Sequence, residues 1–113
     1  MEIRYATHPN DVKYYDTDKL RKEFLIDTLF VSGKLSLVYS HNDRFITGSA
    51  VPTNEPIKLE ANKKDMGADY FLARRELGII NIGPKGIVTV DGTDYELDTK
   101  DCLYVGLGKQ EVI

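Results

Sequence analysis

The chain has 113 residues with 15 basic and 18 acidic side chains, a formal net charge of −3 and a single cysteine. This length suits one domain with its own core, the missing cluster of basic residues argues against nucleic-acid binding, and one cysteine cannot form an internal disulfide. The N-terminus lacks the apolar segment of a signal peptide and no apolar run is long enough to span a membrane, so we expect a cytoplasmic protein with no membrane partner.

Residues 16–18, the sequence DTD, predict the start of a helix. Asp16 is a suitable N-cap, and Leu20, Phe24 and Leu25 repeat at the three-to-four spacing of a helix face. We expect this helix to be short and the only one, and residues 8–10 (HPN) to form a turn. Apolar or alternating runs then predict strands at 29–31, 35–40 and 45–51, with turns at 32–34 and 41–44.

The second half of the chain is dominated by a predicted β-hairpin. Asp91-Gly92 is a dipeptide that accepts positive φ at both turn positions, and apolar, β-branched runs flank it. This turn predicts three facing pairs: Val90 with Thr93, Val88 with Tyr95, and Gly86 with Leu97. Before the hairpin we expect a short strand at 57–60, an exposed polar excursion at 61–69 and a strand beginning at 70–72.

Two further strands, at 77–82 and 102–105, flank the hairpin. The total of eight or nine short strands at this spacing, with no room for helical crossovers, predicts an all-β jelly-roll sandwich. Residues 110–113 look like the start of another strand, so we expect the sandwich to be completed at its C-terminal end by residues outside this chain or by a neighbouring chain. Cys102 lies in a predicted strand and is expected to be an inert, buried thiol rather than a nucleophile.

Part of this region resembles the cupin superfamily, whose histidines and glutamate bind a divalent metal inside a small barrel. Glu76 and Gly83 match the E-x6-G half of the first cupin motif, and Gly108 matches the glycine of the second. The remaining motif positions depart from the pattern: the His-x-His pair falls on Tyr70 and Leu72, or on Asp69 and Phe71, the last histidine falls on Glu111, and Gly106 replaces the proline. Two carboxylates make a poor transition-metal site, so we expect no metal in this chain.

A more extensive resemblance is carried by LRKEFL (20–25), LSLVYSHNDR (35–44), YFLARRELGIINIG (70–83) and the run 87–112. These segments are similar to the N-terminal half of the 5-keto-4-deoxyuronate isomerase family of pectin degradation. The resemblance implies a homohexameric bicupin of roughly twice this length, whose zinc is held by the C-terminal cupin. It also implies conversion of 4-deoxy-L-threo-5-hexosulose uronate to 3-deoxy-D-glycero-2,5-hexodiulosonate, with this half mainly providing scaffold and oligomer contacts.

Three adjacent charged residues are candidates for catalysis. Arg74 or Arg75 could bind the carboxylate of a uronate in a bidentate fork, but neighbours on a strand face opposite ways, and a structural ion pair with Glu76 is the competing interpretation. Glu76 could line a cavity or pair with one of these arginines.

The other candidates are more scattered. His41 lies in a predicted turn, where it could serve catalysis, contact another subunit or simply be solvated, and His8 is a lesser candidate of the same kind. Lys109 and Glu111, near the second cupin motif, could line a cavity mouth and bind substrate or form an exposed charge pair. Tyr104 is expected to be a core or interface aromatic with a bonded hydroxyl.

Two other functions stay open on the sequence. The chain could be a metal-free cupin that binds a sugar acid or serves as an assembly module without catalysis. Alternatively, Glu76 and an arginine could form a metal-independent isomerase site. Catalysis of an aldose–ketose isomerisation needs a base and an electrophile for the enediolate oxygen, and the sequence shows no evident electrophile, so we expect this chain by itself to be inactive.

Overall fold

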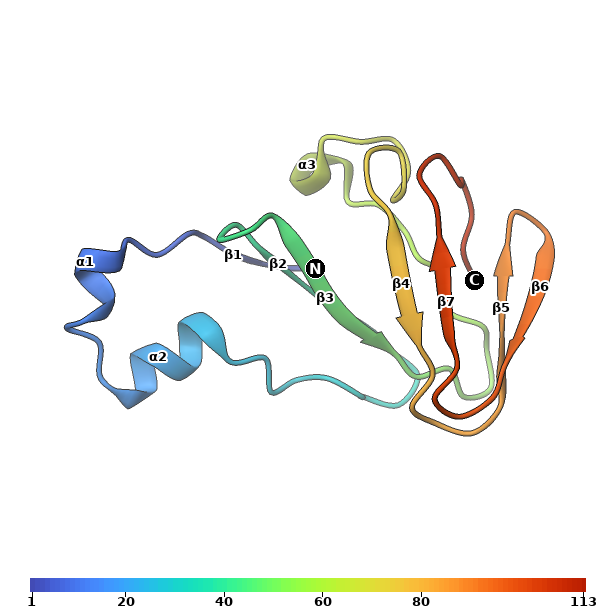
Figure 1. Cartoon of the computed structure of the whole chain (residues 1–113), viewed down its shortest axis with the longest axis horizontal. Coiled ribbons are helices and arrows are strands. Elements are labelled where there is room, and N and C mark those ends of the chain that lie inside the picture. Colours follow the sequence, from blue (N-terminus) through green and yellow to red (C-terminus); the bar gives the residue numbers. More distant parts are fainter. The chain divides into compact units, whose positions relative to one another are not determined.

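The computed structural model describes all residues 1–113 and contains two compact units, Met1–Ile57 and Lys58–Ile113. Strands form most of the regular structure in both units, and the helices are few and short (Figure 1). No helix combines the length and the apolar character needed to cross a membrane. The β-rich class predicted from the sequence is confirmed, whereas the specific jelly-roll topology stays a prediction.

Unit 1, Met1–Ile57, contains one three-stranded sheet and two helices. In chain order its elements are β1 (Glu2–Arg4), α1 (Pro9–Val12), α2 (Thr17–Phe24), β2 (Leu35–Ser40) and β3 (Phe45–Ala50). The sheet order is β1-β2-β3, with β1 parallel to β2 and β2 antiparallel to β3. The only extensive contacts between elements of this unit are those between paired strands, so neither helix packs broadly on the sheet.

Helix α2 forms where the sequence predicts it. The Asp16 carboxylate accepts a hydrogen bond of 2.8 Å from the Lys19 backbone N–H, which satisfies one of the free donors of the first turn. Lys19 and Glu23 form an ion pair of 2.7 Å at the i,i+4 spacing. The helix ends where Leu25 turns to an extended conformation.

Two expectations for unit 1 are wrong. Helix α2 is not the only helix, because Pro9 opens α1 and the His8 Nδ1 atom accepts from the Asn10 N–H; a four-residue helix is too short to leave a periodic pattern. Residues 29–31 form no strand, because Phe30 has φ 62° and leaves the extended region. The turns at 32–34 and 41–44 and the strands that follow them are confirmed.

Unit 2, Lys58–Ile113, contains two two-stranded sheets and one short helix. Its elements are α3 (Lys63–Met66), β4 (Leu77–Ile80), β5 (Gly86–Val90), β6 (Thr93–Leu97) and β7 (Cys102–Val105). The predicted hairpin is confirmed with all three predicted pairs, and both turn residues have positive φ, 47° at Asp91 and 81° at Gly92. Outside the hairpin, β4 pairs antiparallel with β7.

The last residues of the chain pair with the free edge of β5. Val112 bridges Val90, and Thr89 and Ile113 exchange backbone hydrogen bonds of 2.8 and 2.9 Å. The Leu59 N–H in turn donates to the Val112 carbonyl at 2.9 Å, so residues around 59 border this segment although they form no strand. Residues 110–113 therefore have strand-like partners, as their sequence indicates.

Four expectations for unit 2 need correction. Residues 57–60 and 70–72 are not strands, so the whole chain has seven strands instead of eight or nine, and the excursion at 61–69 contains α3. Phe71 and Leu72 are apolar because they are buried in a turn region and not because they extend a sheet. Cys102 is exposed, since alternation along β7 points Val105 inward and Cys102 outward.

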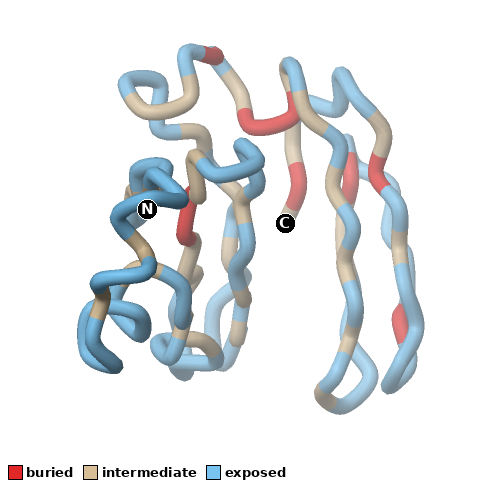
Figure 2. Tube along the Cα trace, turned by 60° about the vertical axis from the view of Figure 1, so that its left-hand side comes forward, coloured by how far each residue is buried: buried red, intermediate tan, exposed pale blue.

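The buried side chains are apolar and unevenly divided between the units (Figure 2). Unit 1 buries only Val38 and Tyr39, both on β2. The buried residues of unit 2 come from its strands, its turn region and the chain end: Ala68, Phe71, Leu72, Val90, Leu97, Val105 and Val112.

Candidate functional site

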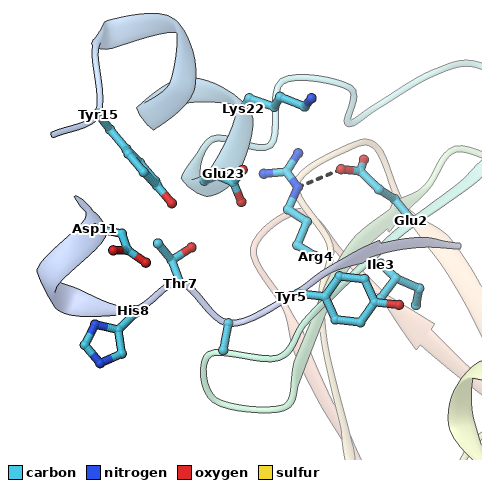
Figure 3. Close-up of a pocket in the computed structure, with 11 residues that line it drawn as sticks. Glu2, Ile3, Arg4, Tyr5, Thr7, His8, Asp11, Tyr15, Lys22 and Glu23 are labelled. Carbon is cyan, nitrogen blue, oxygen red and sulfur yellow. Dashed lines mark hydrogen bonds and ion pairs between the residues drawn. The ribbon is translucent and has the colours of Figure 1, made fainter. Parts of the chain in front are cut away.

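A polar pocket of about 440 Å³ lies in unit 1, between β1 and the segment that carries α1 and α2 (Figure 3). Strand β1 and the residues after it form one wall, and Tyr15, Lys22 and Glu23 form the opposite wall. The other charged or polar lining residues are Glu2, Arg4, Thr7, His8 and Asp11. The pocket thus brings side chains from three consecutive elements to one place.

Arg4 makes two side-chain hydrogen bonds beside this pocket. Its side chain is only 13% exposed, its Nε donates to Glu2 at 2.7 Å, and its Nη1 donates to the Leu25 carbonyl at 2.6 Å. The second bond ties the end of α2 to β1. Glu23 faces the same space, and its ion pair with Lys19 lowers the pKa of the Glu23 carboxyl.

The pocket has a mixed charge that limits what it can do. Three carboxylates, from Glu2, Asp11 and Glu23, stand against two cations, from Arg4 and Lys22. Such a lining suits a small neutral or zwitterionic polar molecule better than a free anion. None of these residues has the activated nucleophile–base pair that would point to covalent catalysis.

His41 lies in the turn predicted for it but is not simply solvated. Its ring stacks on Tyr39 with centroids 4.5 Å apart and on Tyr5 with centroids 5.5 Å apart. Its backbone N–H donates to the Arg4 carbonyl at 2.8 Å, which continues the β1–β2 pairing. Of the interpretations left open, the structure favours a structural role for His41 in joining these two strands. His8 lines the pocket and caps α1.

The structure places Arg74, Arg75 and Glu76 in the irregular segment before β4, so the strand-alternation argument does not apply to them. Arg74 is exposed and close enough to Asp69 to help lower the pKa of that carboxyl, although an ion pair with Lys63 is the larger cause. The partner that the structure shows for Glu76 is the Tyr104 hydroxyl, and this hydrogen bond raises the pKa of Tyr104. The predicted Tyr104 hydroxyl bond is therefore present, but Tyr104 is exposed and not a core residue.

Lys109 and Glu111 do not pair with each other. Lys109 lies 3.9 Å from the Asp91 carboxylate, and Glu111 accepts a hydrogen bond of 2.5 Å from Lys58, which raises the pKa of Lys58. Both residues are thus engaged in separate surface ion pairs on the segment that follows β7. Ion pairs of this exposed kind contribute little to stability.

The residues present do not fit the zinc ion that the cupin resemblance implies. Nowhere in residues 1–113 do three or more histidine, cysteine, aspartate or glutamate side chains converge as metal ligands. Glu76 and Glu111, the two carboxylates at motif positions, are bonded to Tyr104 and Lys58 respectively. A zinc site needs about four donor atoms, each roughly 2.0 to 2.3 Å from the ion.

No family model matches the chain. Individual relatives do: it is 58% identical over 112 residues to the 4-deoxy-L-threo-5-hexosulose-uronate ketol-isomerase of Halalkalibacterium halodurans, and equally identical to that of Lachnoclostridium phytofermentans. It is 48% identical to the protein of the same name from Bacillus subtilis. The chain is homologous to part of this isomerase.

The alignments cover 99% of the chain but only 40% of each of these relatives. The resemblance predicted from the sequence, to the N-terminal part of the uronate isomerase family, is confirmed at this level. The sequence did not predict the pocket around Arg4 and Tyr15. Its lining residues follow no motif, and only the fold of α1 and α2 beside β1 brings them together.

Proposed function

We propose that the chain is the N-terminal, cupin-like part of a 4-deoxy-L-threo-5-hexosulose-uronate ketol-isomerase that acts in the cytoplasm in pectin degradation. The single observation that carries the proposal is 58% identity to such an isomerase, sustained over 99% of the chain. Identity at this level over a whole folded segment argues for a shared role in the parent protein. The reaction would convert the named uronate to 3-deoxy-D-glycero-2,5-hexodiulosonate.

Within this enzyme the chain acts as scaffold. Proton transfer between adjacent carbons needs a base in contact with substrate, and the enediolate oxygen needs an electrophile. Glu76 is held by Tyr104 and Glu111 by Lys58, both on exposed surfaces of unit 2. The chain matches 40% of the length of this relative, which leaves 60% of the enzyme outside the match. The contacts of Glu76 and Glu111 support a division of roles in which that remaining part holds the zinc and the reacting groups. A second cupin and a homohexamer are part of the same proposal.

The proposal is tested with a chimera in which this chain replaces the matched residues of the H. halodurans isomerase. We expect the chimera to consume 4-deoxy-L-threo-5-hexosulose uronate and the 113-residue chain by itself to be inactive. A chimera that folds and melts cooperatively but lacks activity would contradict the proposal. Activity of the isolated chain in the presence of a chelator would show a metal-independent site at Glu76 or an arginine instead.

A second candidate is a metal-free module that binds a sugar acid. The observation behind it is that the polar pocket in unit 1 contains Arg4 and Lys22, while the three carboxylates of the same lining oppose an anion. Arg4 donates to Glu2 through Nε and to the Leu25 carbonyl through Nη1, so a ligand carboxylate would compete with the Glu2 carboxylate for this guanidinium. Calorimetric titration of the isolated chain with galacturonate, compared with an Arg4→Lys variant, separates the two functions. Saturable binding that the variant loses would favour the module.

A further inference from the structure

Helix α2 turns its polar side toward its own unit and its apolar side away from it. Lys22 and Glu23 line the pocket beside β1, and Figure 3 shows both of them on that wall. Leu20 and Phe24, one helical turn apart, do not line it. An amphipathic helix on a finished protein surface has the opposite orientation, with its apolar stripe against the core.

Exposure confirms this inversion. On the polar side Glu23 is half-buried and Lys22 is exposed, whereas on the apolar side both Phe24 (48%) and Leu20 (39%) are exposed. Not one residue of α2 is buried. Leu25, directly after the helix, adds a third exposed apolar residue to the same end.

The helix has little to hold it by itself. Isolated helices shorter than about 12 residues are marginal in water, and most helical stability in proteins comes from packing an apolar face. Helix α2 has eight residues, one N-cap bond, one exposed ion pair and the Arg4 bond at its end. These contacts orient α2 but leave its apolar stripe uncovered.

We propose that the stripe formed by Leu20, Phe24 and Leu25 is a docking surface for the part of the isomerase that lies outside this chain. This inference rests on the proposed function and adds the location of the contact. The relatives align along the whole chain, α2 included, and each carries the larger share of its length beyond the match. That remainder is covalently linked to α2 in every copy, so its effective concentration is far above that of a second molecule.

The partner surface is expected to be apolar with acidic residues at its edge. By helical periodicity, Arg21 borders the stripe on the side of Phe24 and is available to a carboxylate there. Lys19, on the other side, is already paired with Glu23.

Hydrogen exchange of the backbone amides of α2 tests the proposal, measured in the 113-residue chain and in the H. halodurans chimera. We expect the amides of residues 17–25 to exchange about 10-fold or more slowly in the chimera, because docking suppresses local opening. The variant Leu20→Ala/Phe24→Ala keeps good helix formers and should abolish this protection. Leu107→Ala removes an exposed apolar side chain from unit 2, at a site 60% exposed, and is the control.

Several results would overturn the docking proposal. Equal exchange in both proteins means that nothing outside the chain covers the stripe, and slow exchange in the 113-residue chain at every concentration means that it is already covered. Protection that rises with concentration of the isolated chain, and is lost in the double variant, identifies a second copy as the occupant. The unit 2 amides report folding of each variant independently.

The isomerase assay separates this inference from the proposed function. A chimera with α2 protected but no turnover would contradict the function and leave the docking surface intact. Turnover without protection of α2 would contradict the docking surface alone.

Discussion

The two units have similar lengths but bury their apolar residues to very different extents. Seven of the nine buried apolar residues lie in unit 2 and two in unit 1. Unit 1 is not short of large apolar side chains, since nine of them are exposed there against six in unit 2. Apolar content alone therefore does not create a core; the elements must also have faces that can close on one another.

Unit 2 closes because its loops are bonded to its strands. The Asn81 amide donates to the carbonyls of Pro84 and Leu97, both at 2.9 Å, and so joins the end of β4 to the hairpin. The Asp91 carboxylate accepts the N–H groups of Gln110 and Glu111 at 3.0 and 2.8 Å and holds the last segment beside β5. In unit 1 few side-chain hydrogen bonds join the helices to the sheet.

The largest expected effect comes from the core of unit 2. Leu72 is 1% exposed, and Leu72→Ala should lower the free energy of unfolding by about 2–5 kcal/mol through lost burial and a cavity. Chemical denaturation measures the change. Leu107→Ala, at a site 60% exposed, should change it by less than about 0.5 kcal/mol. Equal effects of the two substitutions would mean that Leu72 does not lie in a packed core of unit 2.

A glycine in unit 1 gives the next largest effect. A Cβ atom on Gly48 would lie 2.3 Å from the Ser36 carbonyl oxygen on the neighbouring strand, so Gly48→Ala should force β2 and β3 apart at a cost of about 1–3 kcal/mol. Hydrogen exchange should accelerate in these two strands and stay unchanged in unit 2. Gly78→Ala in β4 is the control, because no atom lies within 4 Å of its added Cβ. Unchanged exchange in β2 would contradict this prediction.

The bonds of Asp91 to the chain end should contribute less. Asp91→Ala removes both acceptor bonds and places alanine at positive φ, and we expect a loss of about 1–2 kcal/mol with faster exchange at residues 110–113. Asparagine tolerates the same φ and retains an acceptor oxygen, so Asp91→Asn should lower the stability by less than Asp91→Ala does. If asparagine and alanine behave alike, charge and not backbone geometry dominates at this position.

The smallest effect concerns the pH dependence of Tyr104. The Glu76 hydrogen bond favours the neutral phenol and raises the pKa of Tyr104 above its ordinary value of 10.0. The stabilisation of the folded protein by this hydrogen bond is therefore fully present below about pH 10, and it is lost as the pH rises through the raised pKa of Tyr104. Ultraviolet titration of tyrosinate should show one late-titrating phenol that disappears in Tyr104→Phe. Glu76→Gln should shift that phenol to lower pH, and no shift would exclude the Glu76 contact.

Much of the local structure could be predicted from the sequence. The Asp91-Gly92 turn and its three facing pairs follow from the φ that these two residues accept, and α2 follows from Asp16 and the spacing of Leu20 and Phe24. The errors occur where an apolar run has another cause. Phe71 and Leu72 fill the core of unit 2 from a turn, and Phe30 and Val31 are exposed in a segment that the positive φ of Phe30 takes out of the extended conformation.

By itself the sequence determined the β-rich class, the hairpin register, the start of α2 and the kinship with the uronate isomerases, because these depend on neighbouring residues or on similarity along the chain. Only the tertiary structure decided that Glu76 bonds to Tyr104, that His41 stacks on two tyrosines and that Arg4 bonds to the end of α2. It also decided that α2 presents its apolar stripe outward. The physical reason is that periodicity fixes which residues share a face of a helix or strand, but only packing selects what that face meets.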